Sequence, residues 1–98
     1  MMSNTKYIVK VIEITTPTCG QCKMIAPSVK KLMSEYSDIN FEEINGVDNP
    51  DICSKYNVSK VPVFVVVYND ESETVIREGS LIKLKKVLKD ASLRREEV

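Results

Sequence analysis

The chain has 98 residues, and its 14 Lys and Arg residues balance its 14 Asp and Glu residues. A chain of this length can bury one hydrophobic core, so we expect a single domain over residues 1–98. The zero net charge gives no electrostatic case for nucleic acid or an anionic membrane as a partner. The most apolar run, residues 61–68, is too short to span a bilayer. The opening MMSNTKYIVK lacks the pattern of an export signal, which predicts a cytoplasmic protein.

Strand and helix patterns alternate along the chain. Runs rich in valine and isoleucine, such as VPVFVVVY, indicate buried strands, and apolar residues at intervals of three and four indicate helices. The expected elements in chain order are a strand at 6–15, a helix from Gly20 to about Ser37 that contains Pro27, a strand at 39–44, a helix from Pro50 to about Asn57, strands at 61–68 and 73–78, and a helix at 81–91. Residues 92–98 form a charged tail that we expect to be frayed.

The order of these elements, β-α-β-α-β-β-α, predicts an α/β fold. Helices that connect strands favour parallel crossovers, whereas the turn at residues 69–72 makes the last two strands antiparallel. We therefore expect a mixed four-stranded sheet with helices on both faces.

A Cys-x-x-Cys pair, Cys19 and Cys22, lies between the first predicted strand and helix. Such a pair can be a redox couple, half of a zinc site or a structural staple. The chain has three cysteines and no histidine, so a structural zinc ion would need a carboxylate or a second chain to complete its ligands. A structural disulfide would be unusual in a reducing cytoplasm. The redox couple is favoured, and we expect no metal ion and no cofactor besides the disulfide itself.

The two cysteines have different expected roles. Cys19 lies at the first turn of the helix, where unpaired N–H groups and the helix dipole favour a thiolate, so it is the expected nucleophile. Cys22 lies one turn further along, within reach of Cys19, and would resolve the mixed disulfide.

Two stretches resemble thioredoxin. CGQCKMIAP (residues 19–27) is similar to the thioredoxin active-site signature at every position but one, and NPDICSKYNVSKVPVF (residues 49–64) resembles the segment that leads to the thioredoxin cis-proline. The resemblance implies a small thioredoxin-like fold that reduces protein disulfides by dithiol exchange. It also implies that Pro62 is cis and exposes the Val61 backbone beside Cys19.

The same resemblance implies partners. The expected clients are disulfide-containing proteins, with ribonucleotide reductase as one candidate, and the expected reductant is a thioredoxin reductase or glutathione. We expect a monomer.

The chain departs from the thioredoxin pattern in several places. The first predicted strand begins almost at the N-terminus, so we expect the leading strand and helix of thioredoxins to be absent, and Thr18 replaces a tryptophan. Gln21 replaces the proline between the cysteines, and we expect it to add a hydrogen-bond donor near the Cys19 thiolate, which would make the couple more oxidising. The residues expected to contact substrate are Thr18, Gly20, Gln21, Val61, Pro62 and Gly79.

Glu13 is the third expected catalytic residue. It stands where thioredoxins carry a buried aspartate, and the lysine that the family pairs with that aspartate aligns with Glu43. A buried carboxylate has a raised pKa and could relay a proton to or from Cys22. The alternative is that Glu13 faces solvent on an exposed strand.

Two other functions remain open at this point. The short core and the sequence TPTC favour a glutaredoxin-type enzyme that uses glutathione, although residues 78–84 lack the Gly-Gly and acidic pair that hold glutathione in that family. A thioredoxin-fold binding module without catalysis is the other alternative. Cys53 is expected to be a small core residue rather than a regulatory thiol.

Overall fold

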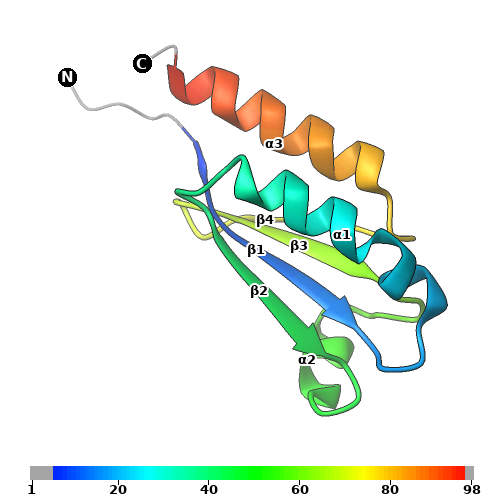
Figure 1. Cartoon of the computed structure of the whole chain (residues 1–98). Coiled ribbons are helices and arrows are strands. Elements are labelled where there is room, and N and C mark those ends of the chain that lie inside the picture. Colours follow the sequence, from blue (N-terminus) through cyan, green and yellow to red (C-terminus); the bar gives the residue numbers. More distant parts are fainter. Residues whose placement is uncertain (1–5, 97–98) are drawn as a thin grey trace.

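The computed structural model describes residues 6–96, with side chains as far as Ser92. The elements in chain order are β1 (Ile8–Thr15), α1 (Gly20–Ser34), β2 (Asn40–Asn45), α2 (Pro50–Lys55), β3 (Val63–Tyr68), β4 (Glu73–Ile76) and α3 (Leu81–Glu96). The strands form one mixed sheet with the order β2-β1-β3-β4, and the helices cover both of its faces (Figure 1). The predicted α/β architecture is confirmed.

The direction of β3 differs from the expected parallel crossover. β1 and β2 are parallel, but β3 is antiparallel to both β1 and β4. The reason is the length of α2, because six helical residues rise only about 9 Å, less than the length of the neighbouring strands. The chain therefore enters β3 at the same end of the sheet at which it leaves β2.

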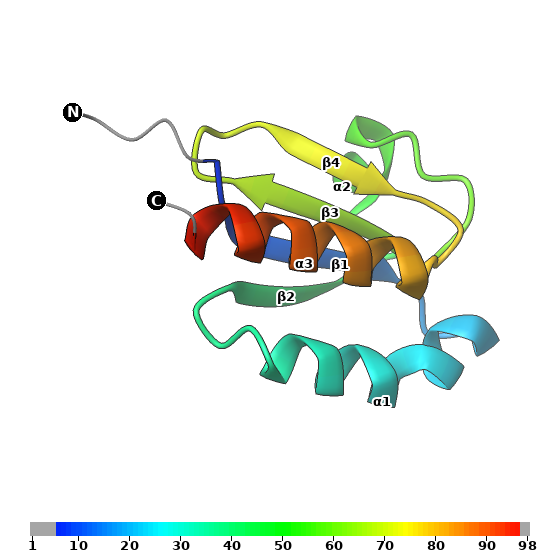
Figure 2. The same ribbon diagram turned by 90° about the horizontal axis from the view of Figure 1, so that it is seen from above.

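Each face of the sheet has its own apolar cluster. α1 and α3 lie together on one face and α2 lies on the other (Figures 1 and 2). Val11, Phe64 and Val66 point towards α1 and α3, whereas Ile14, Val63 and Val65 belong to the cluster with α2. The alternation along β1 and β3 thus assigns side chains to faces, and both strands are buried on both sides.

Several elements end earlier than the sequence pattern predicts. α1 ends at Ser34 because the following backbone N–H groups bond three residues back, which tightens the last turn. α2 ends at Lys55, since Asn57 has a left-handed backbone with φ +51°. β4 ends at Ile76 because Glu78 and the next residue both have positive φ.

Residues 92–96, which the sequence pattern assigns to a frayed tail, are the last residues of α3. This segment contains Leu, two Arg and Glu, all good helix formers, which favours a helix that continues beyond Ala91. Residues 97 and 98 of the predicted tail lie outside the described part.

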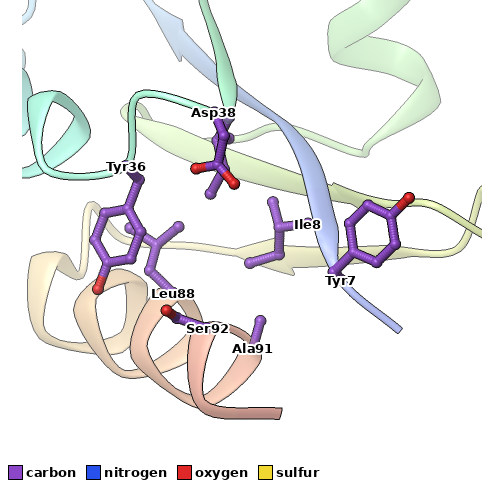
Figure 3. Close-up of a pocket in the computed structure, with 8 residues that line it drawn as sticks. Tyr7, Ile8, Tyr36, Asp38, Leu88, Ala91 and Ser92 are labelled. Carbon is purple, nitrogen blue, oxygen red and sulfur yellow. The ribbon is translucent and has the colours of Figure 1, made fainter. Parts of the chain in front are cut away.

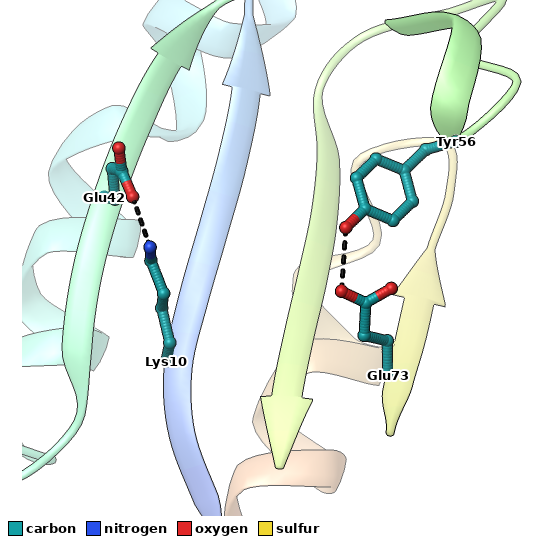
Figure 4. Close-up of polar contacts among 4 residues, drawn as sticks. All are labelled: Lys10, Glu42, Tyr56 and Glu73. Atoms are coloured by element: carbon teal, nitrogen blue, oxygen red, sulfur yellow. Dashed lines mark hydrogen bonds and ion pairs between the residues drawn. The ribbon is translucent and has the colours of Figure 1, made fainter. Parts of the chain in front are cut away.

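Polar contacts tie the edges of the sheet. On the α2 side, the Tyr56 hydroxyl donates to the Glu73 carboxylate at 2.8 Å, and an ion pair of 2.7 Å joins Lys10 of β1 to Glu42 of β2 (Figure 4). At the far end of the sheet, a small pocket of about 40 Å³ opens beside Ile8, Tyr36 and Leu88 (Figure 3). No helix within the described residues is long and apolar enough to cross a membrane.

Candidate active site

Cys19 caps the N-terminus of α1. Its backbone is extended (φ −81°, ψ 108°), and its Sγ accepts a hydrogen bond of 3.0 Å from the Cys22 backbone N–H. An N-cap side chain that accepts from the third helical residue is stabilised when it carries negative charge, because the first N–H groups of a helix lack partners. This geometry favours the thiolate of Cys19 in the reduced protein.

The two cysteines are joined as a disulfide and differ in exposure. Cys19 is half-buried, whereas the side chain of Cys22 is only 6% exposed. An approaching molecule therefore reaches the Cys19 sulfur first. This order agrees with the expected roles of the two thiols.

The loop before β3 faces Cys19. The Val61–Pro62 peptide bond is cis, which confirms that expectation. The Val61 carbonyl oxygen lies 3.7 Å from the Cys19 Sγ. The backbone just before β3 thus lies beside the Cys19 sulfur, the atom expected to react first.

The loop between β4 and α3 forms the third side of the site. The Gly79 backbone N–H donates to the Pro62 carbonyl at 3.0 Å, and Gly79 is buried with φ +61°. The Gln21 side-chain amide donates to the Glu78 carbonyl at 3.4 Å. Gln21 therefore connects the first turn of α1 to this loop, across Gly79.

The Gln21 side chain is bound away from the Cys19 sulfur. Its amide is directed to Glu78 instead of the Cys19 sulfur, which takes its hydrogen bond from the Cys22 N–H. The sequence could not show this contact, because its acceptor is a backbone carbonyl in a loop far along the chain. Glu78 is consequently a site residue that side-chain reasoning misses.

The structure brings most of the predicted site residues together. Gln21, Pro62 and Gly79 are in contact, since a Cβ added to Gly79 would lie 2.9 Å from both the Gln21 Nε2 and the Pro62 Cγ. Thr18 and Gly20 flank Cys19 in the chain and are exposed. Around Gly20 there is open space, so it leaves room for a molecule approaching Cys19.

Gly79→Ala is expected to destabilise the protein by about 1–3 kcal/mol, because the new Cβ meets Gln21 and Pro62 in a left-handed backbone. The matched control is Gly20→Ala, which adds a Cβ into open space at the start of α1. Because alanine favours helix, this control should be neutral or stabilising by up to about 1 kcal/mol. Urea unfolding of the two variants measures the difference, and equal stabilities would contradict the described packing of Gly79.

Glu13 is a buried carboxylate on the face of β1 that α1 and α3 cover. Its side chain is 3% exposed, and its Oε2 has no hydrogen-bond partner among the described residues. In the parallel pairing of β1 and β2, its neighbour is Glu43. Burial and, secondly, the Glu43 charge raise the pKa of Glu13 to about 7. The alternative of a solvent-facing Glu13 is therefore wrong.

An open depression of about 350 Å³ lies between α1 and the ends of β1 and β2. Cys22, Ala26 and Glu43 are among the residues that line it. Glu43 is exposed there, one strand away from Glu13. The depression thus gives the buried side of the cysteine pair a route to solvent beside the Glu43 carboxylate.

Two other predictions concern metal binding and Cys53. Within the described part of the chain, no group of three or more His, Cys, Asp or Glu side chains is placed to hold a metal ion. Cys53 is half-buried instead of fully buried, and its Sγ lies 3.6 Å from the Gly46 carbonyl. It packs against the α2-side cluster, against which Val61 also packs.

Comparison with known proteins places this site in a family. The Thioredoxin family model matches residues 2–90. Thioredoxin of Mycoplasma genitalium is 34% identical over 59 residues, which are 60% of this chain and 58% of that protein. Thioredoxin-T of Drosophila melanogaster is 41% identical over 58 residues, 58% of this chain and 37% of that protein.

Solved structures agree with the sequence matches. Oxidised mitochondrial thioredoxin 3 of Saccharomyces cerevisiae superposes with a TM-score of 0.75 and 31% identity, over 90% of this chain and 80% of that one. The aligned part spans little more than half, or less, of the two curated relatives named above. The fold, the placement of Cys19 and Cys22 and the family match lead to one conclusion: this chain belongs to the thioredoxin family.

Proposed function

We propose that this protein is a thiol–disulfide oxidoreductase that reduces protein disulfides by dithiol exchange, with Cys19 as nucleophile and Cys22 as resolving thiol. The observation that carries the proposal is the N-cap position of Cys19, whose sulfur receives the Cys22 N–H and lies beside the Val61 carbonyl. A thiolate is stabilised there, and a backbone edge for a client peptide is next to it.

The reaction has two exchanges. The Cys19 thiolate attacks one sulfur of the client disulfide, so a Cys19–client bond forms, the client S–S bond breaks, and the other client sulfur leaves as a thiolate that takes a proton. Cys22 then loses its proton and attacks the Cys19 sulfur, which forms the Cys19–Cys22 disulfide and releases the second client thiol. The client gains two electrons and two protons, and the protein loses them.

Glu13 is proposed to accept the proton of Cys22. A carboxyl with a pKa of about 7 can both take and return a proton near neutral pH, which suits an acid–base group. The open depression along Cys22 and Glu43 offers the exchange with solvent. Glu13 lies on the face of β1 that α1 covers, and α1 is the helix that carries Cys22. This common position supports the role.

Substrate binding is proposed along the three loops. The Val61 backbone would pair with the client chain as a short β-type edge, with Pro62 and Gly79 beside it. Thr18, Gly20 and Gln21 would form the rim on the α1 side. The small residue Gly20 and the exposed Thr18 leave the approach to Cys19 open.

The partners follow from the chemistry. Disulfide-containing proteins are the proposed clients, with ribonucleotide reductase as a candidate by family resemblance, and a thioredoxin reductase or glutathione is the proposed source of electrons. We propose that the protein acts as a monomeric single domain in the cytoplasm.

The test is reduction of insulin disulfides with dithiothreitol as electron source, followed by the same assay with glutathione and glutathione reductase. Turnover with dithiothreitol and little with glutathione is the expected result. Efficient turnover with glutathione would identify glutathione as the source of electrons and favour the glutaredoxin-type function over the thioredoxin-type one. If a folded protein reduces no disulfide with either electron source, the thioredoxin-fold binding module without catalysis is the remaining function.

Gln21→Pro is expected to lower the reduction potential of the pair by on the order of 30 mV, which corresponds to about 1.4 kcal/mol for two electrons. Gln21 is the second residue of α1, where the backbone N–H has no partner within the helix and adds positive potential near Cys19. Proline removes that N–H. Gln21→Ala is the control, since it keeps the N–H and removes only the amide bound to Glu78.

The potentials are measured by equilibration with a glutathione buffer and mass spectrometry of the alkylated protein. Gln21→Ala should stay within about 10 mV of the unsubstituted protein, because a weak neutral hydrogen bond away from the sulfur is lost. An unchanged or higher potential in Gln21→Pro would contradict the role of the backbone donor.

A further inference from the structure

The zero net charge of the chain conceals an uneven distribution of charge. α1 carries three lysines and no acidic residue, and α3 as far as Ser92 carries four lysines and one aspartate, Asp90. All seven side chains are exposed. They are Lys23, Lys30 and Lys31 of α1 and Lys83, Lys85, Lys86 and Lys89 of α3.

Both helices cover the same face of the sheet (Figure 2), but not all of the lysines share one surface: Lys83 and Lys86 lie beside β4, and Lys23 lies beside Glu43 of β2. We call the three lysines that border the groove between the helices, Lys31, Lys85 and Lys89, the lysine face. Between the helices runs a groove of about 460 Å³, bordered by Lys31, Lys85 and Lys89, with Tyr36 and one acid, Glu35, also lining it. Within the described part of the chain, none of the seven lysines forms an ion pair. Their charges are therefore available to a partner.

Other exposed acidic residues lie outside the two helices. Glu42 and Glu43 lie on β2, with Glu43 beside Lys23 and Ala26 of α1, and Asp48 and Asp51 lie before and within α2, the helix on the other face of the sheet. All four are exposed. The described side chains of α1 and α3 thus carry an excess of positive charge, which can orient a charged partner during approach.

Exposed apolar side chains lie at the ends of α1 and α3 that are next to the active site. Met24 in α1 and Ile82 in α3 are 80% and 82% exposed. Both lie near the N-terminal ends of their helices, and those ends flank Cys19 (Figures 1 and 2). Large apolar side chains left in water beside a reactive site are typical of a surface that another protein covers.

The composition of the face favours a protein over nucleic acid. The described side chains of α1 and α3 include no arginine, the side chain that most often reads bases, and the groove has one aromatic lining residue, Tyr36, on which a base could stack. Lysines around an apolar end instead match a protein surface that is apolar near its disulfide and acidic further away.

We propose that the lysine face is a docking surface for an acidic protein partner, whose disulfide reaches Cys19 while its acidic residues lie over the groove between α1 and α3. The proposal rests on the proposed function and names the class of client that the site prefers. Lys31 lies eleven residues beyond Gly20, so the acidic residues of the partner must extend about 16 Å from its disulfide.

The probes are synthetic disulfide peptides with a neutral spacer of about five residues, long enough for an extended chain to cover that distance. Beyond the spacer, one peptide carries glutamates, a second carries lysines, and a third is neutral. Two further peptides, one acidic and one basic, carry their charged residues directly beside the disulfide. The difference between their rates measures the effect of charges at the active site itself. Reduction is followed at about 0.01 M and about 1 M salt.

At low salt we expect kcat/KM for the spaced acidic peptide to exceed that for the spaced basic peptide about tenfold. At about 1 M salt, where charges are screened beyond about 3 Å, the preference should approach one. Lys85→Glu with Lys89→Glu should remove most of the preference of the spaced pair. In the same double variant, the preference between the two peptides that carry their charges directly beside the disulfide should change less.

The matched control is Lys55→Glu with Lys60→Glu, which changes the net charge equally on the α2 side. It should retain the preference for the spaced acidic peptide, although Lys60 directly precedes Val61 in the chain. Equal losses in the two double variants would overturn the proposal, because net charge alone would then explain the effect. So would equal rates for the spaced peptides at low salt.

Other outcomes separate the two proposals and the two classes of partner. If the unsubstituted protein fails to reduce even the neutral peptide, the proposed function is contradicted. If it reduces all the peptides without preferring one charge, only the proposed docking surface is contradicted. If a DNA oligonucleotide inhibits reduction through Lys85 and Lys89 while the acidic peptide is not preferred, the face binds nucleic acid and the protein partner is ruled out.

Discussion

The Cys22→Ser protein is expected to accumulate as a mixed disulfide with its client through Cys19, whereas the Cys19→Ser protein forms none. Only Cys19 caps the helix and is open to an incoming sulfur, and Cys22 is 6% exposed behind it. Without the resolving thiol, the first exchange proceeds and the second cannot. Non-reducing mass spectrometry after incubation with oxidised insulin measures the adduct and its site.

Turnover should be lost in both of these variants. Cys53→Ser is the control, because Cys53 lies in the α2-side cluster and shares no contact with the pair. It should keep the turnover of the unsubstituted protein. An adduct of equal yield on Cys22 in the Cys19→Ser protein would reverse the assigned roles.

Glu13→Gln is expected to remove a pH dependence of stability worth about 3 kcal/mol. The pKa of Glu13 is about 7 in the folded protein and about 4.5 when unfolded, so the folded state holds the proton between these values. The stabilisation is complete below about pH 4.5 and is lost as the pH rises through 7. A difference of about 2.5 units at 1.36 kcal/mol per unit gives the magnitude.

Urea unfolding at pH 5 and pH 8 measures this effect. The unsubstituted protein should lose about 3 kcal/mol more than the Glu13→Gln protein between these values. Glu43→Gln removes the neighbouring charge and leaves the burial, so it should move the loss to lower pH without abolishing it. A pH dependence that is the same with and without Glu13 would show that its carboxyl is not the group responsible.

The proposed proton transfer has a separate kinetic signature. Glu13→Gln should slow the release of client from the Cys19 mixed disulfide and leave the attack by Cys19 unchanged, since Glu13 is assigned to Cys22 alone. Rapid mixing with a disulfide peptide resolves the two steps. If both steps slow together, Glu13 supports the structure of the site and does not relay a proton.

Much of the fold follows from local sequence. The Val- and Ile-rich runs of β1 and β3 and the helical spacing after Gly20 determine their elements by short-range patterns. The antiparallel direction of β3 does not, because it depends on how far α2 carries the chain. The extension of α3 past Ala91 is also not evident from local sequence, because the apolar spacing of the helix gives way there to the charged run RREE.

Some residues of the candidate site could likewise be predicted from the sequence, and others could not. Cys19, Cys22 and Pro62 stand in recognisable motifs, so their positions could be predicted. The contact of Gln21 with Glu78 could not, because it joins residues 57 positions apart through a backbone carbonyl. The lysine face also depends on the fold, since only the packing of α1 and α3 on one side turns scattered lysines into one surface.

Dithiol exchange through Cys19 and Cys22 is tested most directly by equilibrating the protein with defined glutathione buffers and mapping the disulfide by mass spectrometry. A single two-electron transition confined to these two cysteines, at a potential between about −270 and −200 mV, is the predicted result. Cys53 should stay reduced throughout. If no Cys19–Cys22 disulfide forms at any ratio, or if Cys53 takes the place of either thiol, the proposed reaction is contradicted.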